Sequence, residues 1–221
     1  MEGPGGGGGA ETEGMYGRTL ASVFRMMEER AEDYEFDVSV SMLEIYNETI
    51  YDLLSEDGGH ASAGSRNAPR KIRIRDRGDG TNDTGDLSSV EVGDAKTTLA
   101  WVAAGRENRA TSYTNMNEHS SRSHCVVSLR IRATNKHETN DGSPGTVTES
   151  RLRMIDLAGS ERVFRSEATG QRLEETKSIN KSLSALGDVI AALKQKQAHI
   201  PYRNSKLTHY LQDSLGKNAK T

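Results

Sequence analysis

The chain has 221 residues, of which 33% are hydrophobic, and this composition is enough for one globular domain with a single core. Its one cysteine, Cys125, excludes an internal disulfide and a cysteine-only metal site, and no apolar run approaches the roughly 20 residues of a membrane span, so we expect a soluble cytoplasmic protein. The net charge of −3 conceals an asymmetry, because residues 151–221 carry 13 basic and 7 acidic side chains. This basic third predicts either a solvated helix face or a surface for a polyanion, such as nucleic acid, anionic lipid or an acidic protein.

The first expected elements are a flexible segment, a helix and a long strand. Residues 1–14 are rich in glycine and bury almost nothing, so we expect a flexible loop. Apolar residues at helical spacing then predict a short amphipathic helix that contains Leu20, Val23, Phe24 and Met27. From residue 36 to residue 42 apolar and polar residues alternate, before Leu43 breaks the pattern, which predicts a strand that runs into a turn around Asn47 and a short helical segment over 50–54.

The middle of the chain predicts edge strands, a helix and two further strands. Residues 55–69 have the composition of a surface loop, and the alternating segments KIRIR (71–75) and LSSVEV (87–92) predict a small outer hairpin. Residues 95–109 predict a helix built around Leu99, Trp101 and Val102. HCVVSLRIRA (124–133) and VTESRLRMIDLAG (147–159) predict two strands joined by a loop over 135–145.

Two helices are expected in the basic third of the chain, over about residues 176–195 and 204–215. The first has an apolar stripe on one face and polar residues on another; the stripe is Ile179, Leu183, Leu186, Ile190 and Leu193, and the polar residues are Lys177, Lys181 and Ser184. Strands with helices between and after them imply an α/β layer fold, in which a central mixed sheet is flanked by helices and carries a small outer hairpin.

The sharpest chemical signal lies where the strand over 147–159 ends. In RLRMIDLAGSE an apolar strand ends in Asp156 and passes directly into the small residues Ala158, Gly159 and Ser160. Ligands and metal ions of α/β folds bind at the carboxyl ends of strands, and in phosphoryl-transfer enzymes such an Asp positions Mg²⁺. A glycine there lets its backbone N–H approach a γ-phosphate. The alternative is an Asp that only caps a turn.

A second polar segment, NMNEHSSRSH over 115–124, precedes a strand and combines amides, hydroxyls, an arginine and two histidines. Hydroxyls and amides suit Mg²⁺ and phosphate oxygens, whereas an ordinary serine-rich turn is the alternative. Arg122 in this segment has an opposite charge in Glu161, just after Gly159. The two segments therefore predict loops that join when a phosphate is present and separate when it leaves.

These segments resemble the kinesin motor superfamily. NEHSSRSH is similar to switch I and DLAGSE to switch II, and the segments LEIYNETIYDLL, TGQRLEETKSINKSLSALGDVIAAL and HIPYRNSKLTHYLQDSLG are similar to the other core signatures in the same order. The helix segment TGQRLEETKSINKSLSALGDVIAAL and the segment YRNSKLT resemble those of the C-terminal-motor, typically minus-end-directed, class of kinesins. The resemblance implies a partial kinesin motor core with a P-loop NTPase-like fold over 15–221, with switch I at 115–124, switch II at 156–161 and microtubule-binding helices over 176–215.

The resemblance also implies a role for individual residues, with ATP and Mg²⁺ as cofactors. Nucleotide contacts fall on Asn117, Ser120, Ser121, Ser123 and Asp156. Of these, Ser121 and Asp156 would hold Mg²⁺ through water. Gly159 would sense the γ-phosphate, and Arg122 with Glu161 would position the attacking water.

The implied partner is the microtubule, with no nucleic acid or membrane partner. The residues that would face acidic tubulin are Lys181, Arg203, Lys206 and His209. Solvated basic side chains are the alternative for each of them. The implied location is the cytoplasmic cytoskeleton, with dimers formed through a neck and stalk outside this sequence.

One element of the family pattern is absent from the sequence. No segment reads GxxxxGK[ST], and the only Gly-Lys pair, Gly216 and Lys217, is followed by Asn218 and has Leu211 at the position of the leading glycine. MEGP followed by GMYGRTLASVF resembles the stretch just after that loop, so we expect a chain that begins downstream of the loop and ends before a final strand and helix.

We therefore expect part of an ATP-driven microtubule motor that does not hydrolyse ATP unaided, and whether the chain is an enzyme stays open. The alternatives are a nucleotide-independent microtubule-binding module and a non-functional truncated gene product.

Overall fold

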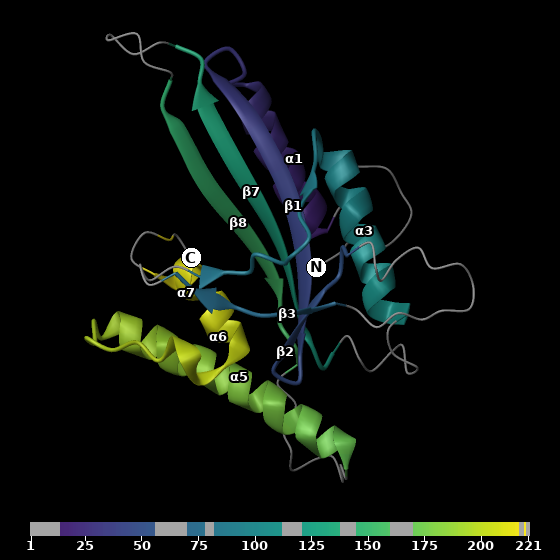
Figure 1. Ribbon diagram of the computed structural model, residues 1–221, viewed down its shortest axis with the longest axis vertical. Helices are drawn as coiled ribbons and strands as arrows, with labels where there is room; N and C mark the ends of the chain where they lie inside the picture. Colours follow the sequence, from purple (N-terminus) through teal and green to yellow (C-terminus); the bar gives the residue numbers. More distant parts are fainter. Residues whose placement is uncertain are drawn as a thin grey trace.

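The computed structural model describes residues 14–55, 70–77, 82–111, 121–137, 145–159, 170–216 and 219. Three long strands form its centre: β1 (Tyr34–Tyr46), β7 (His124–Asn135) and β8 (Val147–Asp156). The sheet order is β3-β2-β1-β7-β8, and β6 (Val90–Glu91) also pairs with β1 (Figure 1). All strand pairs among the described residues are antiparallel. A central sheet flanked by helices confirms the expected fold class, and both long strands of the β7–β8 pair were predicted.

The turn after β1 is a two-residue hairpin loop. Asn47 and Glu48 have φ angles of 48° and 57°, and both lie in the left-handed region that a type I′ turn requires. The expected turn at Asn47 is therefore confirmed. The helical segment expected over 50–54 is wrong, because so short a turn returns the chain directly onto β1 as β2 (Thr49–Asp52), with Ile50 opposite Ile45.

The outer strands are shorter than expected. KIRIR is divided between β3 (Lys71–Ile72), which pairs with β2, and β4 (Arg75–Asp76). The partner of β4 is β5 (Asn82–Asp83), so these two form a separate small sheet. Only Val90 and Glu91 of LSSVEV are strand, in β6. Charged side chains dominate this region, and little apolar surface is available there to extend the pairing.

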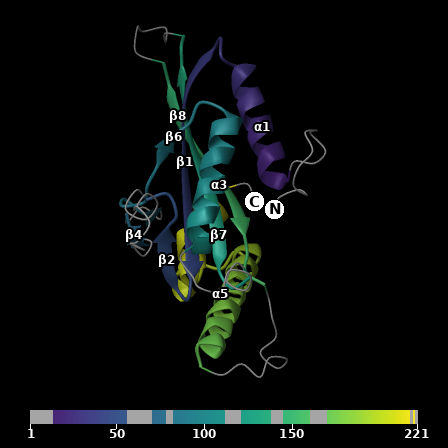
Figure 2. The same cartoon turned by 90° about the vertical axis from the view of Figure 1, so that its right-hand side faces the viewer.

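Two helices cover one face of the central sheet. α1 (Met15–Glu28) and α3 (Ala95–Thr111) lie side by side on this face (Figures 1 and 2) and were both expected from the sequence. Leu20 and Phe24 of α1 and Val102 of α3 pack against Val40 and other inward residues of the strands. Trp101 is 37% exposed, which corrects the expectation that α3 is built around it.

The opposite face carries the helices of the basic third. α5 (Gln171–Lys194) begins five residues earlier than expected. The helix expected over 204–215 is broken into η2 (Tyr202–Asn204), α6 (Lys206–Tyr210) and α7 (Gln212–Leu215). Ser205 caps α6 through a reciprocal capping box with Thr208, so the helix restarts there. Leu207 and Leu211 pack against Leu43 and Val126 to form a second core on this face.

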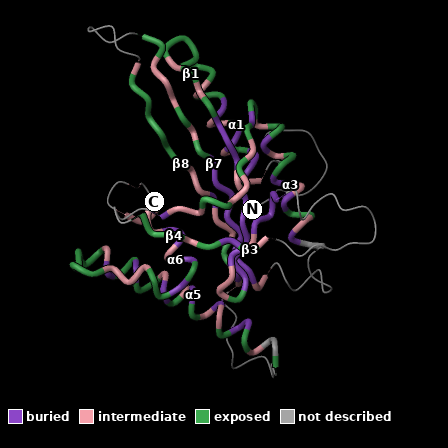
Figure 3. Tube along the Cα trace, viewed as in Figure 1, coloured by how far each residue is buried: buried purple, intermediate pink, exposed green. Residues whose placement is uncertain are grey.

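Most of the buried residues of α5 have small side chains. Ile179, Ala185, Val189 and Ala192 are at most 5% exposed, whereas Ile190 is 52% exposed. Both buried and exposed residues occur along α5 (Figure 3). The predicted stripe is therefore wrong at Ile190, because the helix lies on its neighbours along the Ala–Val row. Within the described residues no helix is long and apolar enough to cross a membrane.

Candidate functional site

The candidate site lies where β8 ends. Asp156 is the last residue of β8 and lies opposite Cys125 in β7. Its carboxyl group is half-buried and makes no hydrogen bond or ion pair to another side chain that the structure describes. Burial raises the pKa of the Tyr16 hydroxyl on α1, and the nearby Cys125 and Asp156 add to this shift. The start of α1 and the end of β8 therefore share one electrostatic environment.

The thiol of Cys125, which lies opposite Asp156, has low reactivity. Its side chain is 2% exposed, and burial raises the pKa of the thiol to about 12. The thiolate is the reactive form of cysteine, so burial keeps this thiol in its less reactive protonated form.

The segments on either side of the β7–β8 pair meet at the backbone. The Gly159 N–H donates a hydrogen bond of 2.8 Å to the carbonyl oxygen of Ser121. Two segments 38 positions apart in the sequence, each predicted to contact a nucleotide, are thus joined by a direct bond. Three of the predicted residues, Asn117, Ser120 and Glu161, lie outside the described residues.

His124 connects this junction to α5. The imidazole is 2% exposed; its Nδ1 accepts the Ala158 N–H at 3.0 Å, and its Nε2 lies 2.7 Å from the Ser182 hydroxyl. Because Ser182 donates its own proton to the Ile179 carbonyl, Nε2 must be the donor to Ser182. Burial, followed by the charge of Arg109, lowers the pKa of His124 to about 4. A neutral imidazole therefore holds the 157–159 segment to the middle of α5.

A second connection to α5 runs through Arg122. Its guanidinium contacts the Glu175 carboxylate at 3.2 Å, and the other oxygen of Glu175 accepts a hydrogen bond of 2.5 Å from the Tyr46 hydroxyl. Glu175 and Tyr46 were not predicted as site residues. Since Glu161 lies outside the described residues, the expected pair of Arg122 with Glu161 stays a prediction.

Behind the junction lies a buried ionic cluster. Arg109 Nε contacts Glu44 Oε1 at 3.0 Å, and Ser123 donates to the same oxygen at 2.5 Å. Arg109 also donates to the carbonyl and hydroxyl oxygens of Ser123, at 3.0 and 2.8 Å. Burial raises the pKa of Glu44, against the opposing effects of Ser123 and Arg109. Ser123, predicted to contact the nucleotide, is thus 1% exposed, and its hydroxyl is bonded within the protein.

A weak signal for this cluster is present in the amino-acid sequence. Glu44 interrupts the apolar residues Leu43 and Ile45 of a buried strand, and an unpaired carboxylate is rarely tolerated there. Its partner, Arg109, lies 65 positions away near the end of α3. Nothing in the spacing indicates that pairing.

Two predicted residues fit a magnesium ion by their chemistry. Mg²⁺ prefers oxygen ligands and keeps several waters, and Ser121 and Asp156 offer a hydroxyl and a carboxylate at the junction of the two segments. When bound, the ion would neutralise charge on phosphate oxygens. Among the described residues no group of three or more His, Cys, Asp or Glu side chains forms a metal site, so a cation here would need ligands from phosphate and water as well.

The predicted tubulin-facing residues lie on α5, η2 and α6, and each contacts an acidic residue of this chain, Lys206 through its backbone N–H. Lys181 Nζ is 3.6 Å from Glu48 Oε2, which also accepts the Lys206 backbone N–H at 3.1 Å. Arg203 forms an ion pair with Asp76, and His209 Nε2 lies 2.7 Å from the same carboxylate. The hydrogen bond from His209 lowers the pKa of Asp76. Lys181 and Lys206 thus share Glu48, and Arg203 and His209 share Asp76.

The family model described as kinesin motor domain matches residues 1–221. The chain belongs to the kinesin motor domain family. It is 46% identical over 204 residues to kinesin-like protein KIN-14Q of Arabidopsis thaliana, and 44% identical over 221 residues to KIN-14A of Oryza sativa subsp. japonica. These matches cover 92% and 100% of this kinesin chain, but only 16% and 21% of the relatives. The KIN-14 relatives support the predicted resemblance to the C-terminal-motor class.

Solved kinesin structures agree with the fold. A KIF14 motor with ADP, in complex with a microtubule, has a TM-score of 0.82 and 35% sequence identity. The motor domain of the Kar3-like kinesin from Ashbya gossypii has a TM-score of 0.73 and 33% identity. Each match covers at least 96% of this kinesin chain and 59% of the solved chain. The chain therefore spans a little over half the length of these motors.

Proposed function

We propose that this kinesin chain supplies the nucleotide-sensing and microtubule-binding part of an ATP-dependent microtubule motor. The observation that carries the proposal is the pair of bonds that His124 makes, to Ala158 and to Ser182. A γ-phosphate that draws the Gly159 N–H toward itself competes with the Ser121 carbonyl for the same donor. Movement of residues 157–159 then acts on His124, and through Ser182 on α5.

This arrangement links two sites in both directions. If nucleotide shifts the position of α5 and α5 contacts the microtubule, then the microtubule must shift nucleotide affinity by the same factor. Arg122 adds a second connection, because Glu175 belongs to the same helix as Ser182. The proposed roles of Asn117, Ser120, Ser121 and Asp156 are nucleotide and Mg²⁺ contacts, while Arg122 and Glu161 position the attacking water.

Hydrolysis needs more than these residues. The sequence contains no GxxxxGK[ST], whose backbone N–H groups and lysine hold the β- and γ-phosphates in this class of enzyme. We therefore propose that this chain by itself does not turn over ATP, and that the complete motor acts on the cytoplasmic cytoskeleton as a dimer through a neck and stalk.

The proposed track surface is formed by Lys181, Lys206, Arg203 and His209. The side chains of Lys181 and Arg203 are 59% and 76% exposed, so both remain accessible to a partner. Exposed ion pairs such as Lys181–Glu48 contribute little to stability. Replacement of such a pair by a contact between the lysine and an acidic partner surface therefore costs little free energy. Attraction of this kind weakens as salt is raised.

Co-sedimentation of the chain with microtubules tests the proposal. We expect pelleting that decreases with salt and is reduced by Lys181→Glu and Lys206→Glu. Lys194→Glu, at the far end of α5, is the matched control and is expected to pellet like the unaltered chain. The absence of pelleting at low salt, or an equal loss for Lys194→Glu, would contradict the proposed surface.

A nucleotide-independent microtubule-binding module is the second candidate. It is favoured by the fact that Glu48 and Asp76, which hold the four predicted residues, belong to the outer strands and turns and not to the 156–159 segment. The two candidates differ in one measurement. Pelleting of this chain joined to the phosphate-binding segment of a kinesin relative changes between ADP and a non-hydrolysable ATP analogue in the motor, and stays the same in the module.

A further inference from the structure

The turn between β1 and β2 has a backbone conformation that its second residue rarely adopts. Asn47 and Glu48 both have φ in the left-handed region, at 48° and 57°. Asparagine tolerates this conformation and glycine adopts it freely, whereas a glutamate there is uncommon. Such a conformation persists where the surrounding structure fixes it, and it is found most often at positions with a role beyond the local fold. The side chain of Glu48 is therefore expected to make contacts outside the hairpin.

Tyr46, the last residue of β1, binds the first part of α5. Its hydroxyl donates a hydrogen bond of 2.5 Å to Glu175 Oε1, and Tyr46 and Glu175 are only 8% and 7% exposed. The other oxygen of Glu175 contacts Arg122 at 3.2 Å. A hydrogen bond to a carboxylate between buried partners is strong and strict in its geometry. It therefore fixes the start of α5 relative to the hairpin.

Glu48 joins α5 to α6. Its Oε2 lies 3.6 Å from Lys181 Nζ on α5, and it accepts the backbone N–H of Lys206, the first residue of α6, at 3.1 Å. The contact with α6 uses the backbone and leaves the charged end of Lys206 free for another partner. Because this contact does not depend on Lys181, Glu48 stays on α6 when Lys181 turns toward a partner surface.

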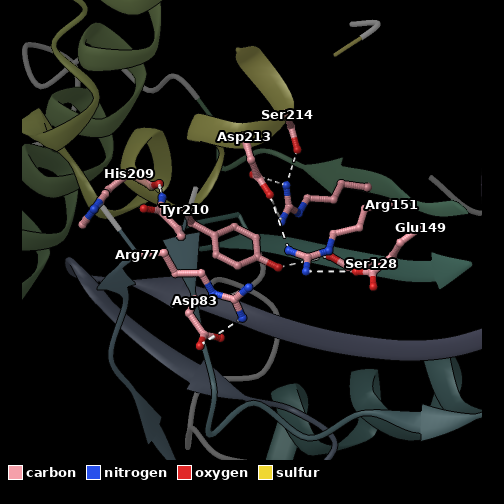
Figure 4. A network of polar contacts seen from close by, with 11 residues as sticks. Arg77, Asp83, Ser128, Glu149, Arg151, His209, Tyr210, Asp213 and Ser214 are labelled. Atoms are coloured by element: carbon pink, nitrogen blue, oxygen red, sulfur yellow. Dashed lines mark hydrogen bonds and ion pairs between the residues drawn. The ribbon is translucent and has the colours of Figure 1, made fainter. Parts of the chain in front are cut away.

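α6 and the short helix after it are fixed to the central sheet. The Tyr210 hydroxyl of α6 lies 3.1 Å from the Ser128 hydroxyl of β7, and Asp213 of α7 contacts Arg151 of β8 at 3.6 Å (Figure 4). α5 touches α6 and η2 along its side. The hairpin therefore connects α5 to a support that belongs to the sheet, through residues that do not include 156–159.

We propose that Tyr46 and Glu48 are positioning residues for the microtubule surface on α5 and α6. This inference rests on the proposed function, in which Lys181 and Lys206 contact the track. The hairpin holds the two lysines at a set distance from each other, because Tyr46 fixes α5 through Glu175 and Glu48 fixes the junction with α6. The segment over 157–159 acts on α5 from the other side, and the hairpin is the fixed support against which α5 moves.

Hydrogen exchange of the free 221-residue chain tests the positioning role without a microtubule. In Tyr46→Phe, which removes only the hydroxyl, we expect the amides of residues 175–182 to exchange about tenfold faster, while the amides of β1 and β7 keep their rates. Tyr51→Phe, on β2 of the same hairpin, is the matched control and is expected to exchange like the unaltered chain. Unchanged rates in α5, or an equal increase along the whole chain, would overturn the assignment of Tyr46.

Co-sedimentation then tests the effect on the surface. Tyr46→Phe changes no charge, and it is expected to raise the microtubule concentration at half-maximal pelleting about threefold, whereas Tyr51→Phe leaves it unchanged. Equal pelleting of Tyr46→Phe and the unaltered chain would overturn the inference. Failure of the unaltered chain to pellet would instead contradict the proposed function, and hydrogen exchange would still decide whether the hairpin positions α5.

Two variants of Glu48 separate charge from position. Glu48→Gln removes the charge beside Lys181 but keeps an oxygen that can accept the Lys206 N–H, so its pelleting is expected to be at least as strong as that of the unaltered chain. Glu48→Ala removes the acceptor as well, and it is expected to need about threefold more microtubules than Glu48→Gln. Thermal melts of each variant confirm that it is folded. Equal pelleting of the two variants would mean that Glu48 acts through its charge alone, and would overturn its assignment.

Discussion

Replacement of Arg109 by methionine tests the buried ionic cluster behind the candidate site. Glu44 is fully buried and the Arg109 side chain is 10% exposed, so the substitution leaves a carboxylate in the interior without its cation. Among the described residues it also removes three hydrogen bonds, one to Glu44 and two to Ser123. Breaking a buried pair from one side costs about 3–5 kcal/mol, and we expect Arg109→Met to lower the free energy of unfolding by that amount at pH 7.

The loss is expected to depend on pH. Burial already raises the pKa of Glu44, and removal of Arg109 takes away an opposing influence, so the pKa in the folded variant rises further. A folded pKa above the unfolded value of about 4.3 means that the folded state holds the proton more tightly. The contribution of Glu44 to the stability of the variant is therefore greatest at low pH. The free energy of unfolding falls by up to about 1.4 kcal/mol per pH unit as the pH rises from the unfolded pKa of Glu44 to its folded pKa.

Urea denaturation followed by circular dichroism measures the effect. Arg18→Met, on the exposed side of α1, is the control and is expected to change the free energy of unfolding by less than about 0.5 kcal/mol. The double variant Glu44→Met with Arg109→Met removes both charges and is expected to recover most of the loss. A loss below about 1 kcal/mol for Arg109→Met, or a double variant as unstable as the sum of the two single ones, would refute the reasoning.

Three further outcomes are expected. The pKa of His124 is about 4 in the folded chain and 6.5 in its ordinary state, so the unfolded chain binds the proton first as the pH decreases. The free energy of unfolding therefore falls by about 3 kcal/mol between pH 6.5 and pH 4. We expect the denaturation midpoints of His124→Gln to lack this part of the pH dependence. Val189→Ala, at a fully buried position of α5, lowers the free energy of unfolding by about 2 kcal/mol, and Ile190→Ala beside it changes it by less than half as much, as measured in urea. Asp76→Asn removes the carboxylate that neutralises Arg203, so microtubule pelleting should increase with little change in the melting temperature; a decrease would contradict the role assigned to Arg203.

Patterns along the chain predicted the elements that bury apolar surface over many residues. The patterns over 36–42, 124–133 and 147–159 identified β1, β7 and β8, and the apolar residues of 15–29 and 95–109 identified α1 and α3, because each of these elements is at least ten residues long. The failures fall on short elements. The segment over 50–54 has too few residues to distinguish a strand from a helical turn, and the two-residue hairpin at Asn47 decides between them.

The two helices of the basic third show a different limit. The stripe predicted for α5 contains large apolar residues, yet the helix packs along Ala185, Val189 and Ala192 and leaves Ile190 exposed. Hydrophobic spacing reports which residues can be buried, whereas the neighbouring elements select which of them are buried. The break at Ser205 likewise depends on its capping box with Thr208, which the apolar pattern of 204–215 does not reveal.

The sequence alone determined the kinesin resemblance, and it predicted the position of both switch segments and the candidate residues Arg122, Asp156 and Gly159, because these signals are contiguous in the chain. The tertiary structure decided which residues connect them: His124 with Ser182, Arg122 with Glu175, and Glu44 with Arg109. These partners are between 53 and 65 positions apart. Only packing brings such residues together, since a buried polar atom takes whichever partner the fold places within reach.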